Sequence, residues 1–372
     1  MRLIQLCDRG PARLLMNLDS YYSLKPLIPR WLQIQLRQHI VRRLVRRNSS
    51  SWPISESAGA APPAFPGWPG GKRFALVLTH DVESAAGVSH CEQLADMEQE
   101  RGFRSALGFV PLRYQTPERL RRTLVERGFE VLVHDLYHDG RLYRSRKVFE
   151  QRLPRINEFL AQWQTRGFSS GSMLHNLSWI GDLDIDYAVS TYDVDPFEPQ
   201  ACGLGRIFPC WVQPPDRTRP GFAELPYTIA QDFTVFILLR EKNNAIWRRK
   251  LDWIAEKGGM ALIKTHPDYM AFGAQDRRFD RYPVEHYTDF LDYVQSRYKD
   301  EFWLAHPSAV AGYWRGLQPQ EASCGSVMAT AGTLCPSCRR ACAEGWLSDY
   351  PPKVVATRTA CSVTRRVVPD GD

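Results

Sequence analysis

Short apolar runs alternate with segments of helical periodicity between residues 72 and 316. The apolar runs predict strands at residues 74–78, 104–110, 130–134, 187–192, 233–239, 260–265 and 302–305. The helical periodicity predicts helices at residues 91–101, 117–127, 146–165, 245–257, 284–298 and 307–315. Because strands that alternate with helices form parallel sheets, this order indicates an α/β protein, and about seven such units favour closure into a barrel.

A basic segment precedes the predicted barrel, at residues 24–47. Apolar side chains recur along it every four residues, among clustered arginines, at Leu32, Leu36, Ile40 and Leu44. The pattern is typical of an interfacial helix on an anionic membrane, but a stripe this narrow is also common on helices packed on the protein's own main domain, and the latter is favoured. The following residues 49–71 are rich in Ser, Ala, Pro and Gly, which predicts a linker or an irregular strap.

The character of the chain changes again at Gln318, where periodicity disappears and the last five of the nine cysteines begin. Three of them, at Cys335, Cys338 and Cys342, have a spacing that could bind zinc with Cys324 or Cys361 as the fourth ligand. The alternative is a disordered tail without a packed core. Three parts are therefore predicted: an arm and linker at 1–70, a barrel at 71–317 and a Cys-containing tail at 318–372.

The net charge of +7 is unevenly distributed, because residues 57–317 hold 32 Lys and Arg against 33 Asp and Glu. A neutral main domain argues against a nucleic-acid groove. The chain has no apolar run of about 18 residues, so no transmembrane span is predicted. Asp8, Arg9 and Arg13 interrupt the first apolar stretch, which is unlike a secretory signal. With scattered cysteines, these features predict a cytoplasmic protein that contacts the inner face of the membrane peripherally through residues 24–47.

Polar side chains gather where the predicted strands end, in "THDVE", "VHDLYH" and "KTHPDY". In parallel barrels the chemistry lies at these carboxyl ends. His134 and His138 are four residues apart, so on one helical turn both imidazoles would face the same side and could hold a zinc ion. The alternative is a pair of surface histidines.

Two carboxylates follow the first predicted strand, at Asp81 and Glu83. Residues two apart on an extended segment point to the same face, so one could bind the metal while the other stays free as a base. His266, after another predicted strand, is placed to donate a proton. Solvated loop residues and a turn histidine are the structural alternatives.

These residues resemble the polysaccharide deacetylases, carbohydrate esterase family 4, which share the NodB-homology domain. The family's T-F-D-D motif is matched loosely by residues 79–83, its H-[ST]-x-x-H motif by residues 134–138, and its late L-x-H motif by the strand ending at His266. The similarity covers residues 72–316 and is strongest to a bacterial branch associated with surface polysaccharides.

The resemblance implies a distorted (β/α)7 barrel and a metal-dependent enzyme, which removes N-acetyl groups from an amino sugar of a surface polysaccharide or lipid-linked glycan. Glu83, His134 and His138 would hold a divalent metal, expected to be zinc. Asp81 would be the catalytic base, or the direct ligand if the two carboxylates exchange roles. His266 would protonate the leaving amine.

Two departures from the family pattern change the expectation. Val82 stands where the family has a metal-binding Asp, and Ser169 and Gly171 stand where an Arg orients the catalytic carboxylate. Without that arginine, Asp81 needs another partner, and His80 and His175 are the nearest in sequence. Restoring the pattern with Ser169→Arg is then expected to raise activity. The alternative function is a degenerate barrel that binds a glycan or a partner enzyme without turnover.

Overall fold

The computed structural model describes residues 28–48, 50–63, 65–200, 203–213 and 219–318. The predicted zinc ligands of the tail, and the first 27 residues, lie outside this part of the chain. The main sheet runs through nine strands. They are β1 (Phe74–Val82), β2 (Ala106–Phe109), β3 (Glu130–His134), β4 (Gly167–Ser169), β5 (Tyr187–Ala188), β6 (Cys210–Val212), β7 (Phe222–Glu224), β8 (Met260–Thr265) and β11 (Phe302–Leu304).

The sheet closes on itself. Strand β1 pairs in parallel with β8, and through its last four residues with β2. Parallel pairing continues from β2 through β3, β4 and β5 to β7. The chain after β7 then bridges back to β8, where Ile229 pairs with Ile263 and Thr228 N donates to Leu262 O at 2.9 Å. Seven strand positions complete the ring, which confirms the predicted distorted (β/α)7 barrel.

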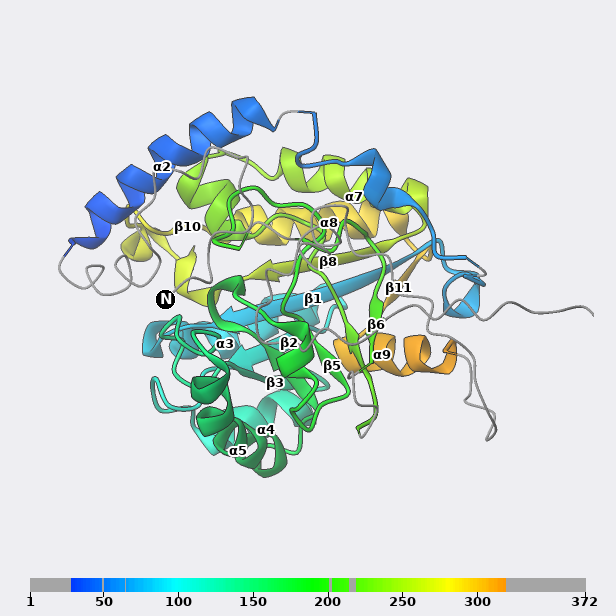
Figure 1. Cartoon of the computed structure of the whole chain (residues 1–372). Coiled ribbons are helices and arrows are strands. Elements are labelled where there is room, and N and C mark those ends of the chain that lie inside the picture. The colour runs from blue at the N-terminus through cyan, green and yellow to red at the C-terminus, as the bar shows by residue number, and fades with distance from the viewer. Residues whose placement is uncertain (1–27, 49, 64, 201–202, 214–218, 319–372) are drawn as a thin grey trace, which may run out of the picture.

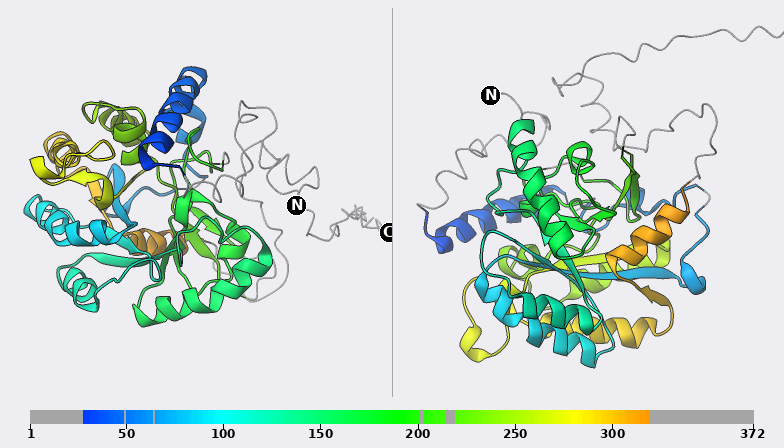
Figure 2. Two further views of the ribbon diagram at one scale, coloured as in Figure 1. Left: turned by 90° about the vertical axis from the view of Figure 1, so that its left-hand side faces the viewer. Right: turned by 90° about the horizontal axis from the view of Figure 1, so that it is seen from below.

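Helices surround the ring of strands (Figure 2, left). The α-helices are α2 (Arg30–Arg47), α3 (Ala85–Glu100), α4 (Glu118–Glu126), α5 (Arg146–Gln162), α6 (Leu177–Ile180), α7 (Ala245–Lys257), α8 (Glu285–Tyr298) and α9 (Pro307–Gly316). Short 3-10 turns lie at η3 (Glu56–Gly59), η4 (Pro69–Gly71), η5 (Gly171–Met173), η7 (Pro267–Tyr269) and η8 (Ala274–Asp276), and β9 (Met270–Ala271) pairs with β10 (Tyr282–Pro283).

One predicted strand is wrong, because residues 233–239 contain a π-helix, η6 (Phe233–Leu238). All six of its side chains are buried. A helix that is apolar on every side has the same continuous pattern as a buried strand, so periodicity could not separate the two. Strands β4, β6 and β7, each three residues long, were not predicted, because a run that short carries no recognisable period.

The segment between α2 and β1 is the irregular strap rather than a free linker. Trp52 and Trp68 are buried in it, and Trp68 Nε1 donates to Gly258 O at 2.8 Å. Ala58 O accepts from Ile207 N at 3.0 Å. These contacts hold the strap, which connects the arm to β1, against the barrel.

Helix α2 lies against η6 on the outside of the barrel (Figure 1). Its buried side chains are Ile34, Gln38 and Val41, and Gln38 Nε2 donates to Ile237 O at 2.8 Å. The stripe seen in the sequence is divided, since Leu44 packs against the core whereas Leu36 is 53% exposed. Within the described residues, no helix has both the length and the apolar character needed to cross a bilayer.

Candidate metal centre

Strand β1 delivers two carboxylates to the mouth of the barrel. Asp81 is buried near the end of the strand, and Glu83 follows it by two residues. Val82, between them, is fully buried and packs with Phe109 and Leu107 in an outer cluster. The alternation of a pleated strand therefore turns Val82 away from the carboxylates, and Glu83 lies 3.1 Å from His138 Nε2.

His134 ends β3, and His138 lies in the loop that follows. Both Asp135 and His138 have positive φ angles, 56° and 52°. The two histidines therefore meet through a tight left-handed loop and not on a helical turn, which corrects the spacing argument. Gly171 makes room for this loop, because a Cβ there would lie 2.4 Å from Asp135 Oδ2 and 3.0 Å from His138 Cδ2.

Three side chains converge as a potential ligand set. One donor atom each from Glu83, His134 and His138 lies within 4.8 Å of the other two. His138 Nε2 is 3.1 Å from Glu83 Oε1, and the buried Nε2 atoms of both His134 and His138 have no hydrogen-bond partner among the described residues. On the other side of its ring, His134 Nδ1 lies 3.2 Å from Ser169 O, a contact that leaves the lone pair of Nε2 directed at the cluster.

The electrostatics also suit a cation. Burial lowers the pKa of His134 to about 3, so this imidazole is neutral at pH 7, as a metal ligand must be. Burial alone would lower the pKa of His138, but Glu83 outweighs it and raises that pKa. The negative charge that favours a proton on His138 favours a metal ion equally. Two imidazoles and one carboxylate form a donor set that zinc accepts.

Asp81 has a partner that the sequence analysis did not identify, Lys264 of β8. The Lys264 Nζ atom lies 2.8 Å from Asp81 Oδ2, 2.7 Å from Ser169 Oγ and 3.0 Å from Val189 O. Burial would raise the pKa of Asp81, but His134 and Lys264 outweigh it and hold that pKa below its usual range. Because His134 is neutral at pH 7, we attribute the effect there to the Lys264 ammonium.

The two histidines expected beside Asp81 lie elsewhere, so that expectation was wrong. His80 is buried between Thr265 Oγ1 and Glu98 Oε1, at 2.7 Å from each. His175 Nδ1 contacts Met173 O at 3.1 Å. A signal for Lys264 was present, since a lysine inside an apolar run needs a buried partner, and only the fold could show which one.

His266 forms a dyad with Asp232, another residue missed by sequence reasoning. His266 Nδ1 is 2.7 Å from Asp232 Oδ1, and its backbone N donates to Asp232 Oδ2 at 2.8 Å. Burial alone would lower the pKa of His266, but Asp232 outweighs it and raises the pKa to about 9. His266 therefore carries a proton at neutral pH. The sequence gives no signal for Asp232, because the apolar run that follows it fits a strand as well as the helix η6.

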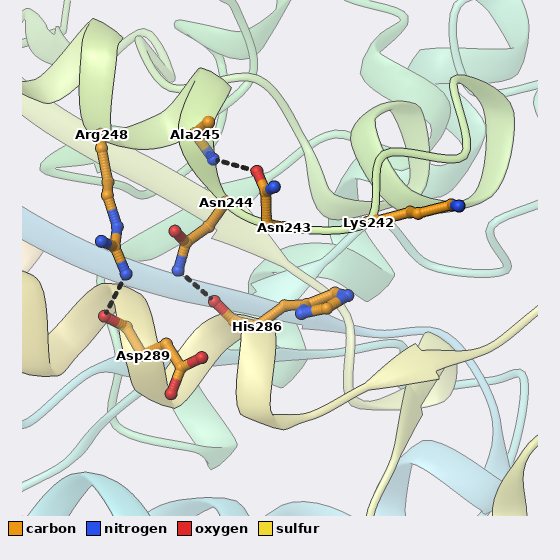
Figure 3. A pocket seen from close by; sticks show the side chains of 7 residues that line it. All are labelled: Lys242, Asn243, Asn244, Ala245, Arg248, His286 and Asp289. Carbon is orange, nitrogen blue, oxygen red and sulfur yellow. Dashed lines mark hydrogen bonds between the residues drawn. The ribbon is translucent and has the colours of Figure 1, made fainter.

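A separate pocket of about 410 Å³ lies between the N-terminal ends of α7 and α8 (Figure 3). Asn244 Nδ2 donates to His286 O at 2.9 Å across it, and Arg248 Nη2 donates to Asp289 O at 3.4 Å. None of the predicted site residues lines it. The polar side chains that line this pocket connect α7 to α8, so a structural role accounts for them.

No family model matches this chain, and no curated protein does. Solved structures do. A candidate polysaccharide deacetylase from Mycobacterium smegmatis has a TM-score of 0.52 at 17% identity, over 72% of this chain and 99% of its own. The allantoinase PuuE gives 0.54 at 15% identity, over 73% and 99%. A candidate polysaccharide deacetylase from Pseudomonas aeruginosa PAO1 gives 0.53 at 16% identity, over 73% and 100%.

The chain therefore has the NodB-type fold of carbohydrate esterase family 4. Its barrel mouth carries a His and Glu cluster of the kind that holds a divalent metal. The fold class predicted from the sequence is thereby confirmed, and the individual site residues stay predictions.

Proposed function

We propose that this protein is a metal-dependent hydrolase that removes N-acetyl groups from an amino sugar of a surface polysaccharide or lipid-linked glycan. The observation that carries the proposal is the convergence of Glu83, His134 and His138 beside the buried carboxylate of Asp81, with donor atoms of the first three within 4.8 Å of one another. We propose zinc as the metal, because two imidazoles and one carboxylate suit it. When bound, such a cation activates water and polarises a carbonyl group.

The side chains have distinct proposed roles. Asp81, kept ionised by its ion pair with Lys264, accepts a proton from the attacking water. Ser169 and Lys264 fix the orientation of that carboxylate. The protonated His266, held by Asp232, donates a proton to the amine nitrogen as the amide bond breaks. Asp81 thus gains a proton from water while His266 gives a different proton to nitrogen, the carbon–nitrogen bond breaks to release acetate and the amine, and exchange with solvent restores both side chains.

The class of substrate rests on the carbohydrate enzymes among the structural neighbours and on the motif resemblance. The allantoinase among them shows that a fold by itself does not select the substrate. N-acetylated chito-oligomers are accordingly the first substrates to test, by following the release of acetate and of a free amine. An activity confined to other amides would overturn the carbohydrate part of the proposal.

The decisive experiment joins metal content to turnover. Purified protein supplied with zinc or cobalt should bind one equivalent, and His134→Ala or His138→Ala should remove it. Asp81→Asn should keep the metal and abolish turnover, whereas Glu83→Gln should weaken metal binding. The reverse pattern would exchange the two carboxylate roles. A wild-type protein that binds no metal would overturn the hydrolase, and one that binds metal and glycan without turnover would favour the degenerate barrel.

We also propose that the protein lies in the cytoplasm and contacts an anionic membrane surface through the arm, residues 24–47. In support, the outer side of α2 combines the exposed Leu36 with exposed Arg43 and Arg47, and the helix contains no acidic residue. Binding to vesicles of phosphatidylcholine with and without phosphatidylglycerol tests this. Arg43→Glu should weaken binding to the anionic vesicles, while Arg119→Glu, exposed on α4, should not. Binding to duplex DNA instead would overturn it.

A further inference from the structure

The arm helix reaches the metal centre as well as the outside of the barrel. In Figure 1 its N-terminal end lies on the side toward which the arrow of β1 points, the side of the candidate site. The Arg30 guanidinium there lies 5.6 Å from the ring centre of Phe233 and 5.9 Å from that of Tyr269. The N-terminal end of the arm therefore contacts both η6 and the loop that follows β8.

Tyr269 connects this end of the arm to Glu83. Its hydroxyl donates to Glu83 Oε2 at 2.6 Å, and Arg30 Nη2 donates to the same hydroxyl oxygen at 3.5 Å. The ring packs on Phe233 with centroids 4.8 Å apart, and on His266 at 5.1 Å. Tyr269 therefore occupies Oε2 of Glu83, while Oε1 faces His138 Nε2 at 3.1 Å within the ligand cluster.

Arg30 is in turn fixed by the docking of α2. Ile34, one turn further along the helix, is 2% exposed. Arg37 lies 5.0 Å over the Phe233 ring from the next turn. A long side chain that is held over two rings keeps one orientation, so it restricts the tyrosine beneath it.

We propose that Arg30 and Tyr269 are positioning residues of the metal ligand Glu83, so that the arm helix is an integral part of the metal centre. This inference rests on the proposed function, because it takes Glu83 as a ligand. The physical reason is orientation: residues that hydrogen-bond a ligating carboxylate fix its direction, and their loss typically costs about 10- to 100-fold in metal affinity. Arg30 has no hydrogen bond to Glu83 among the contacts described and reaches it through the Tyr269 hydroxyl, so its positioning effect should disappear when that hydroxyl is absent.

The test is a competition titration of zinc, repeated with cobalt, on the full chain. Tyr269→Phe keeps the packed ring and removes the hydroxyl, and it should weaken metal binding about 10-fold or more. Arg30→Met should weaken it by a smaller factor, and the double variant should be no weaker than Tyr269→Phe alone. Arg42→Met, another exposed arginine of the same helix, is the matched control and should bind metal as the wild type does. Thermal melting of each variant checks the fold.

The outcomes separate this inference from the function on which it rests. If the wild type binds metal and Tyr269→Phe binds it equally well, the positioning role is overturned and the hydrolase stands. If the losses in metal affinity from Arg30→Met and Tyr269→Phe multiply in the double variant, Arg30 does not act through the Tyr269 hydroxyl, and that part of the inference is overturned. If the wild type binds no metal, the proposed function itself fails and the inference falls with it.

Discussion

The ammonium of Lys264 lies 2.8 Å from the carboxylate of Asp81, and the two residues stand on neighbouring strands, β8 and β1. Both side chains are buried, so each charge depends on the other. In the proposed mechanism this lysine would take the orienting role that the family resemblance gives to an arginine, although Lys264 is 95 residues away from Ser169 in the sequence. A cation on a different strand can reach the same carboxylate, because the carboxyl ends of all strands in a barrel meet at one mouth.

Replacing Lys264 is expected to disable the base. Lys264→Met leaves Asp81 buried without its ion pair, which should cost on the order of 3–5 kcal/mol of stability, raise the pKa of the carboxyl group, and lower turnover roughly 100-fold. Lys250→Met is the matched control, because Lys250 is an equally buried lysine paired with Asp193 at 2.5 Å. Melting curves should show both variants destabilised. Comparable loss of turnover in the two variants would mean that general destabilisation, and not the base, explains the result.

Ser169→Arg is expected to lower activity, contrary to the expectation from the sequence alone. Ser169 is 1% exposed, and its hydroxyl lies 2.7 Å from Lys264 Nζ and 3.3 Å from Asp81. A second, larger cation in this position would meet like charge and filled space. Ser169→Ala, which creates no clash, should retain turnover within about 10-fold. Turnover rates and melting temperatures of the two variants test this prediction. Faster turnover in Ser169→Arg than in the wild type would contradict it.

The His266 and Asp232 dyad predicts the alkaline limb of the pH profile. Because the pKa of His266 is raised to about 9, the proton donor should stay loaded up to that pH, and kcat should fall above it. Asp232→Asn removes the cause, so the fall should begin at a lower pH. The kcat of Asp232→Asn and of the wild type is measured from pH 5 to 10. If kcat falls at the same alkaline pH in both, His266 is not the proton donor.

The same dyad predicts how stability depends on pH. A histidine whose folded pKa lies above its unfolded value of about 6.5 stabilises the fold when protonated. Its contribution is complete below pH 6.5, declines as pH rises, and is lost above about pH 9. The gap in unfolding free energy between wild type and Asp232→Asn should therefore be larger at pH 6 than at pH 9.5, as denaturant titrations would measure. A gap that widens with pH would contradict the assignment.

Arg113 is expected to oppose metal binding. Its Nη1 lies 2.7 Å from His138 Nδ1 and 2.9 Å from His138 O. An arginine only donates hydrogen bonds, so this contact favours the tautomer with hydrogen on Nε2, where a metal would bind, and it adds a nearby positive charge. Arg113→Met should therefore strengthen zinc binding several-fold, measured beside Arg141→Met as a control. Weaker binding in Arg113→Met would show that the arginine instead holds the loop in its binding shape.

The sequence by itself determined the barrel and the first residues of the site. Apolar runs of the length of β1 and β8, each followed by polar side chains, required strands covered on both faces and placed Asp81, Glu83 and His266 at their carboxyl ends. The alternation of a strand also predicted that Glu83, and not Val82, shares the face of Asp81. These conclusions depend only on the geometry of a single strand, which residues close together in the sequence determine.

Only the tertiary structure decided which distant side chains meet. Lys264 reaches Asp81, Asp232 reaches His266, and the arm reaches Tyr269 through contacts between residues 34 to 239 positions apart. The same holds for η6, whose wholly apolar run fits a helix as well as a strand until its neighbours are known. Periodicity reports which face of an element is buried, but the partner across that face depends on how the ring of strands closes, and that is a property of the whole fold.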